Sequence, residues 1–284
     1  MTQVGIFAKP NVPAAYQVVG PLLEWLNERS IRYRMDAETA KYAGLNEGFP
    51  RECVADGCNL VIVLGGDGTL LSAARAVGGR EVPLLAVNLG SLGFLTAIKV
   101  DDLFPELERV LLGHHKSSRR RMLHIDLVRQ GSIVATYEAL NDVVITKASI
   151  ARMIEVEVNV NDRFMCAYRA DGLILATPTG STAYSLSAGG PIIYPVVEAF
   201  CLTPICPHTL TNRPVLVPSD LLISIVNRAV DETAFLTVDG QVGEPLQEGD
   251  RLDCRRSEFF VHLVRPPDKS FFDVLRQKLK WGER

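Results

Sequence analysis

Two patterns of apolar and polar positions divide the sequence. In the first part, short apolar runs alternate with longer segments in which apolar residues recur every three or four positions. The apolar runs predict strands over Val4–Ala8, Ile31–Met35, Leu60–Leu64 and Leu84–Val87. The longer segments predict helices over Ala14–Asn27, from Thr69 onward and over Asp101–Leu112. Strands that alternate with helices are typical of a parallel, doubly wound, Rossmann-like α/β domain.

From Arg121 onward, apolar residues recur at every second position, which indicates strands with one buried face. Alternation is clearest in Leu123–Val128 and in Ile154–Asn161, and the turn pair Asn161-Asp162 predicts a hairpin. Further strands are expected over Leu173–Ala176, Leu221–Val226, Phe235–Val238 and Phe259–Val264. The second part is therefore expected to be an all-β domain.

The last periodic segment, Phe271–Leu279, predicts a helix with Phe272, Leu275 and Leu279 on one side. A single helix after a β domain is expected to pack back on the first domain. The polar stretch from His114 to Arg121 reads as a junction or a strand start. We therefore expect residues 1–116, with 267–284 returning to them, to form the α/β domain and residues 117–266 the β-rich domain.

Composition narrows the class of protein. The 284 residues are 47% hydrophobic and 22% charged, with a net charge of −3, so a nucleic-acid or membrane partner is not expected. The basic run near residue 118 is interpreted as a solvated junction, because no aromatic residues interleave with it. The six cysteines form no C-x-x-C pair, and the start lacks a signal-peptide pattern, so a cytoplasmic protein with reduced thiols is expected. A zinc site at Cys201, Cys206 and His208 lacks an obvious fourth ligand.

The stretch Leu60–Leu71 carries the first candidate chemistry. A buried strand ends at Gly65-Gly66, and a helix begins after Asp67-Gly68-Thr69. Glycines let backbone N–H groups approach a phosphate, and a helix N-terminus attracts negative charge. Asp67 is unusual there, since a carboxylate among phosphates needs a role such as taking a proton from a hydroxyl nucleophile. The pattern is neither a Walker loop nor G-x-G-x-x-G, and a plain tight turn with a helix cap is the alternative.

A second candidate lies in Asp171–Pro195, which is rich in glycine and hydroxylated residues. Ser181 or Thr182 is expected to cap a short helix through Ala183–Ser187, and Tyr184 could stack on a planar ring. A Ser/Thr-rich loop with a buried tyrosine is the alternative.

Several blocks together resemble the NAD kinases, in that family's order and over nearly the whole chain. They are GGDGT at Gly65–Thr69, NLGSLGFLT at Asn88–Thr96, LNDVVI at Leu140–Ile145, TPTGSTAYSLSAGGPI at Thr177–Ile192, PICPHTLTNRP at Pro204–Pro214 and VDGQ at Val238–Gln241. GGDGT is shared with diacylglycerol kinases, whereas the long block from Thr177 makes the match specific. The resemblance implies an N-terminal α/β domain, a C-terminal all-β domain and catalysis at their interface.

The resemblance also implies residue roles. Asp67 matches the catalytic base for the 2′-hydroxyl of the adenosine ribose, and Gly68 a dinucleotide contact. Asn141 and Asp142 match the pair that holds the ribose, with Asp142 in place of the family's frequent glutamate. Asp171 matches a residue near the nicotinamide end. Other implied contacts are Arg152, Arg169, Thr182, Ala183, Tyr184, Ser185, Leu186, Ser187 and Gln241, and the implied phosphate cradle is Gly65, Gly66, Gly68 and Thr69.

The function expected from this resemblance is transfer of a phosphoryl group from ATP or polyphosphate to NAD, which gives NADP. The family implies a divalent cation, with Mg²⁺ expected on the donor phosphates, although the protein ligands for a metal are unknown. It also implies a homodimer or homotetramer. Two other hypotheses are a lipid kinase that shares GGDGT and a non-catalytic NAD(P)-binding sensor.

Overall fold

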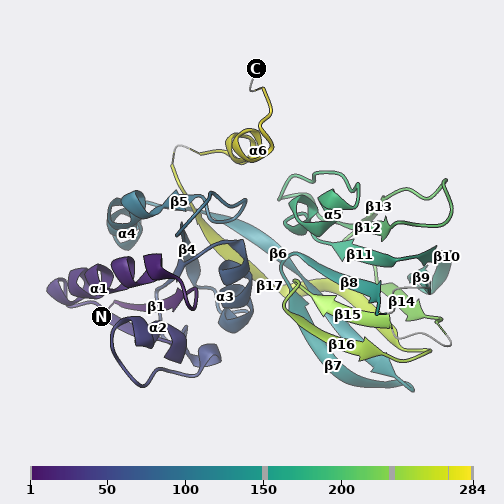
Figure 1. Cartoon of the computed structure of the whole chain (residues 1–284), viewed down its shortest axis with the longest axis horizontal. Helices are drawn as coiled ribbons and strands as arrows, with labels where there is room; N and C mark the ends of the chain where they lie inside the picture. The colour runs from purple at the N-terminus through teal and green to yellow at the C-terminus, as the bar shows by residue number, and fades with distance from the viewer. Residues whose placement is uncertain (1, 149–152, 230–233, 268, 283–284) are drawn as a thin grey trace. The chain divides into compact units, whose positions relative to one another are not determined.

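A computed structural model describes residues 2–148, 153–229, 234–267 and 269–282. The chain divides into two compact units, which Figure 1 shows coloured along the sequence. Unit 1 comprises residues 1–119 and 259–284, and unit 2 comprises residues 120–258. Unit 1 is therefore built from two separate stretches of the chain.

Unit 1 has a parallel sheet at its centre. Its strands are β1 (Gln3–Ala8), β2 (Arg32–Met35), β3 (Leu60–Leu64), β4 (Pro83–Asn88) and β5 (Ile98–Lys99). The order is β2-β1-β3-β4, and the end of β17 (Arg251–Arg265) pairs in parallel with β4 at Leu263 and Leu84. All five residues of β3 are buried, as its uninterrupted apolar run predicts for a strand covered on both faces.

Helices cover both faces of this sheet. They are α1 (Pro13–Glu28), α2 (Ala37–Tyr42), α3 (Asp67–Val77) and α4 (Leu103–Leu111), with short 3₁₀ turns at η1 (Arg51–Cys53) and η2 (Val100–Asp102). The last helix of the unit is α6 (Phe271–Leu279). Val4, Ile6 and Ala8 share a core with α1 and α4. The alternate residue Gly5 instead faces Val54, which follows η1. The fold is thus doubly wound, as predicted.

Helix α6 belongs to unit 1 and contacts the loop between β4 and β5. The N-cap Ser270 and Asp273 form a reciprocal capping box, which fixes where the helix starts. Before it, Lys269 Nζ donates to Ala97 O at 3.0 Å, and later Lys278 lies 5.6 Å from the ring of Phe94. The return of this helix to the first domain is confirmed.

Unit 2 contains two antiparallel sheets. One has the order β10-β9-β14-β17, with β6 pairing with both β17 and β7. Its other strands are β6 (Lys116–Arg129), β7 (Ser132–Ala139), β9 (Ile154–Val160), β10 (Arg163–Ala170) and β14 (Ile223–Asn227). Asn161 and Asp162 have positive φ, which suits the tight hairpin predicted between β9 and β10.

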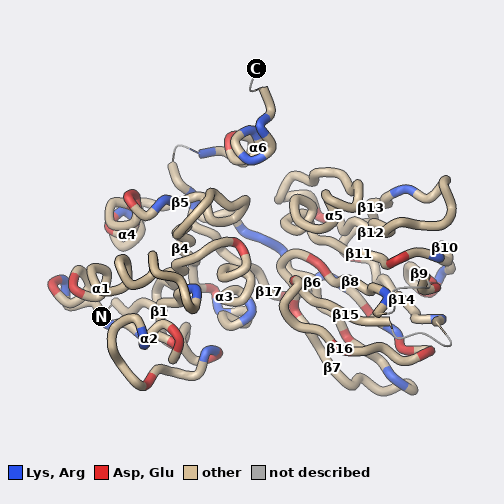
Figure 2. Tube along the Cα trace, in the orientation of Figure 1, with Lys and Arg blue, Asp and Glu red and all other residues tan. Residues whose placement is uncertain are grey.

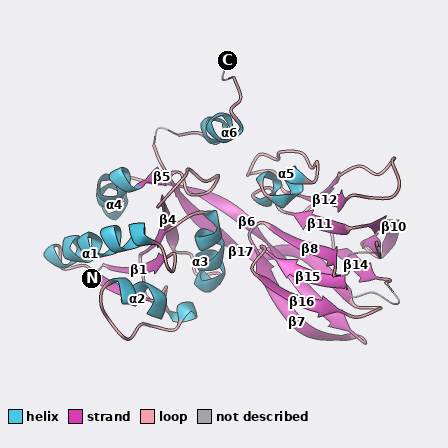
Figure 3. Ribbon diagram, in the orientation of Figure 1, coloured by secondary structure: helices cyan, strands magenta, loops and turns pink. Residues whose placement is uncertain are grey.

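The second sheet of unit 2 has the order β13-β12-β11-β8-β15-β16. Its strands are β8 (Asp142–Lys147), β11 (Gly172–Ala176), β12 (Ala199–Ile205), β13 (Val215–Pro218), β15 (Ala234–Val238) and β16 (Val242–Leu246). Residues of both sheets, such as Leu123 and Leu127 on β6 and Val143 on β8, share one apolar core. Figure 3 shows the strand-rich character of this unit, in which η3 (Gly180–Thr182) and α5 (Tyr184–Ser187) are short.

Candidate active site

The turn after β3 places Asp67 at the first residue of α3. A Cβ on Gly65 would lie 2.3 Å from Thr69 Oγ1, so only glycine fits where the turn folds against the helix. Gly66 is the N-cap and has no atom within 4 Å of its Cβ position, while Gly68 is exposed. Within the predicted phosphate cradle, Gly65 and Thr69 therefore pack on each other, and Gly66 and Gly68 are the more open pair.

The Asp67 carboxylate is held by the loop that follows β4. Its Oδ1 accepts hydrogen bonds from Leu95 N at 3.1 Å, Thr96 N at 3.0 Å and Thr96 Oγ1 at 3.0 Å. Its Oδ2 accepts one from Phe94 N at 2.9 Å. A Cβ on Gly93 would lie 2.1 Å from Asp67 Oδ1, so glycine is needed for this approach. The loop that follows β4 therefore meets the glycine-rich turn that follows β3, and the two meet at Asp67.

Asn88 shapes that loop from inside. It is buried at the end of β4, and its Nδ2 donates to Ser91 O at 2.5 Å and to Thr96 Oγ1 at 2.9 Å. Its Oδ1 accepts from Gly90 N at 2.7 Å. These contacts fix Thr96, which in turn donates to Asp67. Asn88 is a positioning residue that the sequence marked only as part of a motif.

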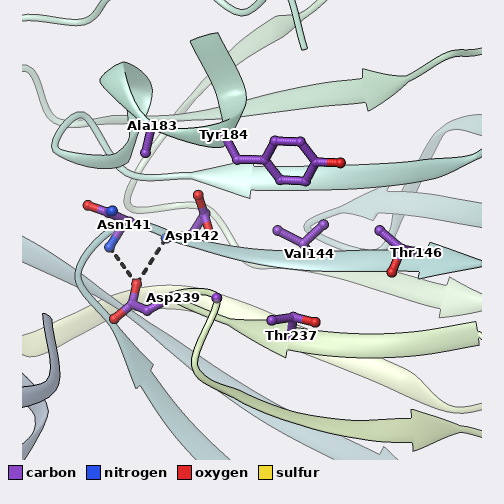
Figure 4. A pocket seen from close by; sticks show the side chains of 9 residues that line it. Asn141, Asp142, Val144, Thr146, Ala183, Tyr184, Thr237 and Asp239 are labelled. Atoms are coloured by element: carbon purple, nitrogen blue, oxygen red, sulfur yellow. Dashed lines mark hydrogen bonds between the residues drawn. The ribbon is translucent and has the colours of Figure 1, made fainter. Parts of the chain in front are cut away.

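A pocket of about 320 Å³ lies on unit 2 beside the start of β8. This volume falls in the range of about 300–1,000 Å³ in which proteins bind small ligands. The pocket is lined by Asn141, Asp142, Val144, Thr146, Ala183, Tyr184, Thr237, Asp239 and Gly240. Figure 4 shows the ring of Tyr184 on one side and Val144 and Thr146 on the other. Four predicted contact residues, Asn141, Asp142, Ala183 and Tyr184, therefore share one pocket.

Asp239 holds the first residues of β8 in place. Its carboxylate accepts hydrogen bonds from Asn141 N at 2.7 Å, Leu140 N at 3.1 Å and Asp142 N at 3.3 Å, and Figure 4 shows two of them. Burial, together with the negative charge of Asp239, raises the pKa of Asp142 to about 7. Near neutral pH, Asp142 can thus either donate or accept a proton in a hydrogen bond.

The hydroxyl-rich block packs directly on the same residues. Thr177 Oγ1 donates to Leu140 O at 2.6 Å, and Thr177 N donates to Asn141 O at 2.8 Å. A Cβ on Gly180 would lie 2.1 Å from Asn141 O, so this close approach requires glycine. Two blocks that are far apart in the sequence therefore build one wall of the pocket.

The predicted helix cap in this block is wrong. Helix α5 begins at Tyr184 with Ala183 as its N-cap, and no side chain caps it. Ser181 Oγ instead donates to Pro178 O at 2.7 Å and accepts from Ile193 N at 2.9 Å. Thr182 Oγ1 donates to Thr179 O at 3.3 Å. These hydroxyls brace the loop, because the 3₁₀ turn η3 brings backbone carbonyls within their reach.

The other predicted residues of this block are not among those that line the pocket. Ser185 is buried, and its hydroxyl bonds to that of Thr203 at 2.9 Å. Leu186 is half-buried and Ser187 is exposed. The pocket thus takes Ala183 and Tyr184 from this segment.

The remaining predicted contacts lie elsewhere on unit 2. Asp171 forms an ion pair with Lys147 at 2.6 Å. Arg169 is exposed on β10, and Gln241 is exposed in the turn after β15, next to the pocket residue Gly240. Arg152 lies outside the described residues.

Sequence reasoning missed five lining residues: Val144, Thr146, Thr237, Asp239 and Gly240. Val144 and Thr146 follow Asp142 at a spacing of two, so the strand period could have placed them on the same face. Asp239 and Gly240 belong to the VDGQ motif, from which only Gln241 was selected.

The described residues contain no preformed metal-binding site. No group of three or more His, Cys, Asp or Glu side chains there could hold a metal ion, and all six cysteines are free thiols. Nor does any described helix have both the length and the apolar character needed to span a membrane.

Comparison with known proteins identifies the family. The model of the ATP-NAD kinase N-terminal domain matches residues 4–115, and that of the ATP-NAD kinase C-terminal domain matches residues 140–266. The chain belongs to the ATP-NAD kinase family. An NAD kinase of Solibacter usitatus is 59% identical over 280 residues, which cover 99% of this chain and 98% of the relative. One of Koribacter versatilis is 50% identical over the full length of both chains.

Solved structures agree with the ATP-NAD kinase assignment. Yeast NADH kinase complexed with NADH matches with a TM-score of 0.92 at 26% identity, over 100% of this chain and 89% of that one. An Archaeoglobus fulgidus NAD kinase in complex with ATP shares the fold, with a TM-score of 0.78 at 24% identity over 98% and 99% of the two chains. The predicted family, fold class and phosphotransferase class are confirmed.

Proposed function

We propose that this protein transfers a phosphoryl group from ATP or polyphosphate to the 2′-hydroxyl of the adenosine ribose of NAD, which yields NADP. The observation that carries the proposal is the constrained carboxylate of Asp67 in a glycine-rich turn, in a chain of the ATP-NAD kinase family. Residues 1–116 with 267–284 are proposed as the nucleotide-binding domain that carries GGDGT and residues 117–266 as the β-rich NAD-binding domain.

Asp67 is proposed as the general base. A carboxylate oxygen has two lone pairs, and Oδ2 accepts one hydrogen bond, from Phe94 N. Oδ2 therefore keeps an acceptor position for a substrate hydroxyl, while three donors on Oδ1 fix the orientation of the group. The donors come from backbone and from a side chain held by Asn88, so the base is oriented before substrate binds.

In the proposed step, the ribose 2′-oxygen forms a bond to the terminal phosphorus of the donor, and the bond from that phosphorus to the bridging oxygen breaks. The hydroxyl proton passes to Asp67 Oδ2, and ADP, or a polyphosphate shorter by one unit, leaves with the bonding electrons. Gly66 and Gly68 are proposed to cradle the donor phosphates with their backbone, together with Gly65 and Thr69 at the start of α3.

The pocket on unit 2 is proposed to hold the dinucleotide. Tyr184 offers an exposed ring face to a base, and Asp142 offers a carboxyl group to ribose hydroxyls. Asn141 Oδ1 is buried and has no hydrogen-bond partner in the described part of the chain, as expected of an acceptor that a substrate completes. The NADH bound in the yeast relative supports a dinucleotide ligand.

Further dinucleotide contacts, at the positions implied by the family, remain part of the proposal. They are Gly68, Arg152, Arg169, Asp171, Thr182, Ala183, Ser185, Leu186, Ser187 and Gln241. A homodimer or homotetramer and a cytoplasmic location are proposed on the same ground.

The described side chains do not form a site for a resident metal ion. Mg²⁺ is therefore proposed to arrive on the donor, coordinated by phosphates and water, where it neutralises phosphate charge. No protein ligand is assigned to it.

The proposal is tested by an end-point assay of the purified protein with NAD or NADH, ATP or polyphosphate, and Mg²⁺ present or withheld. NADP or NADPH is detected with an NADP-specific dehydrogenase. We expect product only when a donor and an acceptor are both present. Labelled lipid from diacylglycerol and ATP, without NADP, would favour a lipid kinase. NAD binding measured by calorimetry without turnover of any pair would favour a sensor.

A further inference from the structure

A second pocket, in unit 1, is unlike the first in its charge. It has a volume of about 360 Å³ and lies where β17 ends and α6 begins. Its polar lining consists of Arg109, His114, Lys116, Arg265, Lys269 and Ser270. Figure 2 shows basic residues at the start of β6 and in the segment that leads into α6. None of these residues belongs to the proposed site for NAD or to the glycine-rich turn.

The walls of this basic pocket are tied together by Arg109. Its Nη1 donates to His114 O at 2.6 Å and its Nη2 donates to Arg265 O at 3.2 Å. Its Nε donates to Glu106 Oε2 at 3.0 Å, so the charge of Arg109 is balanced within α4. Arg109 thus fixes the end of β17 against the chain before β6, which gives the pocket a defined shape.

The other basic groups leave an excess of positive charge. Lys116 and Arg265 are exposed, and neither they nor Lys269 forms an ion pair within the described residues. Asp273, the acid nearest along α6, is already paired with Arg276. Asp268, which lies outside the described residues, cancels at most one of the three charges. In a protein with a net charge of −3, such a local excess marks a preference for a multiply charged anion.

The location favours a ligand as well. Arg265 and Pro266 lie at the carboxyl end of β17, which is parallel to β4 in the sheet of unit 1. Ligands of open α/β sheets bind beyond the carboxyl ends of parallel strands. Guanidinium and ammonium groups together match phosphate oxygens in charge and hydrogen-bonding capacity. Two or three unbalanced cations fit an oligophosphate better than a monocarboxylate.

We propose that the pocket formed by Arg109, His114, Lys116, Arg265, Lys269 and Ser270 binds an oligophosphate anion at a site separate from the glycine-rich turn. The site is linked to the loop that holds the Asp67 carboxylate, because Lys269 Nζ donates to Ala97 O, one residue after Thr96. An anion bound in the pocket attracts Lys269 and so competes with its hydrogen bond to Ala97 O. We therefore expect binding of an anion to loosen the loop that holds Asp67.

The experiment measures binding of inorganic tripolyphosphate to the full chain by calorimetry, and locates it by hydrogen–deuterium exchange. In the wild type we expect slower exchange in residues 109–116 and 269–275. The double variant Lys116→Ala/Arg265→Ala changes two exposed side chains, so the fold is retained. It should bind at this site about tenfold or more weakly, because two charged hydrogen-bond donors are lost.

The control is Arg32→Ala/Lys41→Ala, which removes the same charge from exposed positions of unit 1 outside the pocket. It should keep the affinity within about twofold, because screened charges at a distance contribute little. Protection of residues 65–69 alone, equal affinity of the double variant and wild type, or an equal loss in the control would each overturn the proposal. A parallel titration with ATP distinguishes a nucleotide from a free phosphate chain as the source of the anion.

Discussion

Two aspartates, one in each unit, occupy opposite environments. Asp67 follows a buried strand and accepts four hydrogen bonds, three of them from backbone N–H groups. Asp142 begins a buried strand, where burial and a second carboxylate, Asp239, raise its pKa to about 7. The surroundings of Asp67 supply hydrogen-bond donors that hold its carboxyl oxygens in place. The surroundings of Asp142 instead favour the protonated carboxyl group. The comparison teaches that the surroundings, more than the residue type, set what a carboxyl group can do.

The largest effect is expected from Asp67→Asn, which removes the proposed base. The rate constant for NADP formation should fall by a factor on the order of 10²–10⁴, while the affinity for NAD changes little. Steady-state kinetics and calorimetry with NAD measure the two quantities. Asp101→Asn, an exposed acid in the same unit, is the control. Normal turnover by the Asp67 variant would remove the base assignment.

A pH-dependent loss of stability is expected from Asp142. Its pKa is raised in the folded state from 3.8 to about 7, so the folded protein binds this proton more tightly than the unfolded chain does. Stability from this group is therefore greatest below about pH 4 and is lost as the pH rises to about 7, by at most on the order of 4 kcal/mol.

Urea unfolding of the wild type and Asp142→Asn at several pH values measures this effect. The variant lacks the titrating group, so its advantage over the wild type should grow between about pH 4 and pH 7 and then level off. A constant difference across that range would contradict the raised pKa.

A smaller effect on rate is expected from Gly93→Ala. The added methyl group would lie 2.1 Å from Asp67 Oδ1 and 2.3 Å from Thr96 Oγ1, so the loop must move away from the carboxylate. We expect kcat to fall about 10- to 100-fold because misplaced catalytic groups are costly. Gly90→Ala is the matched control in the same loop, since its Cβ meets only Asn88 Oδ1, at 3.9 Å. Equal rates in the two variants would argue against a tightly held Asp67.

An effect on substrate affinity, and not on the chemical step, is expected from Tyr184→Ala in the pocket of unit 2. Loss of an aromatic ring that stacks on a base costs about 1–3 kcal/mol, so the KM for NAD should rise roughly 5- to 150-fold with little change in kcat. Tyr184→Phe retains the ring and should stay close to the wild type. If both variants behave alike, the ring does not stack on the substrate.

Elements whose pattern is local could be predicted closely. Strand β3 and helix α6 have the predicted limits, because an apolar run and a capped amphipathic segment define them. Strands β13 and β16 were missed: each contains a proline, Pro218 or Pro245, which is tolerated because both strands lie at the edges of their sheet.

Features that depend on distant partners could not be predicted. The prediction of which side of α6 is apolar and buried was partly wrong, because Phe272 is 55% exposed and Val274 is buried instead. In the site, the sequence marked Asp67 and Asn141 but not what holds them. Phe94–Thr96 and Asp239 are far away in the chain, and only the folded sheets bring their N–H groups and carboxylate to these residues.

The discontinuity of unit 1 has a consequence for synthesis. Its last strand segment and α6 follow every residue of unit 2 in the chain, so they emerge from the ribosome after the glycine-rich turn and its loop. Until then the carbonyl oxygen of Ala97 lacks its hydrogen bond from Lys269, and the ring of Phe94 lacks its contact with Lys278. The nascent chain thus carries Asp67 beside a loop that gains these two contacts only when the last helix docks.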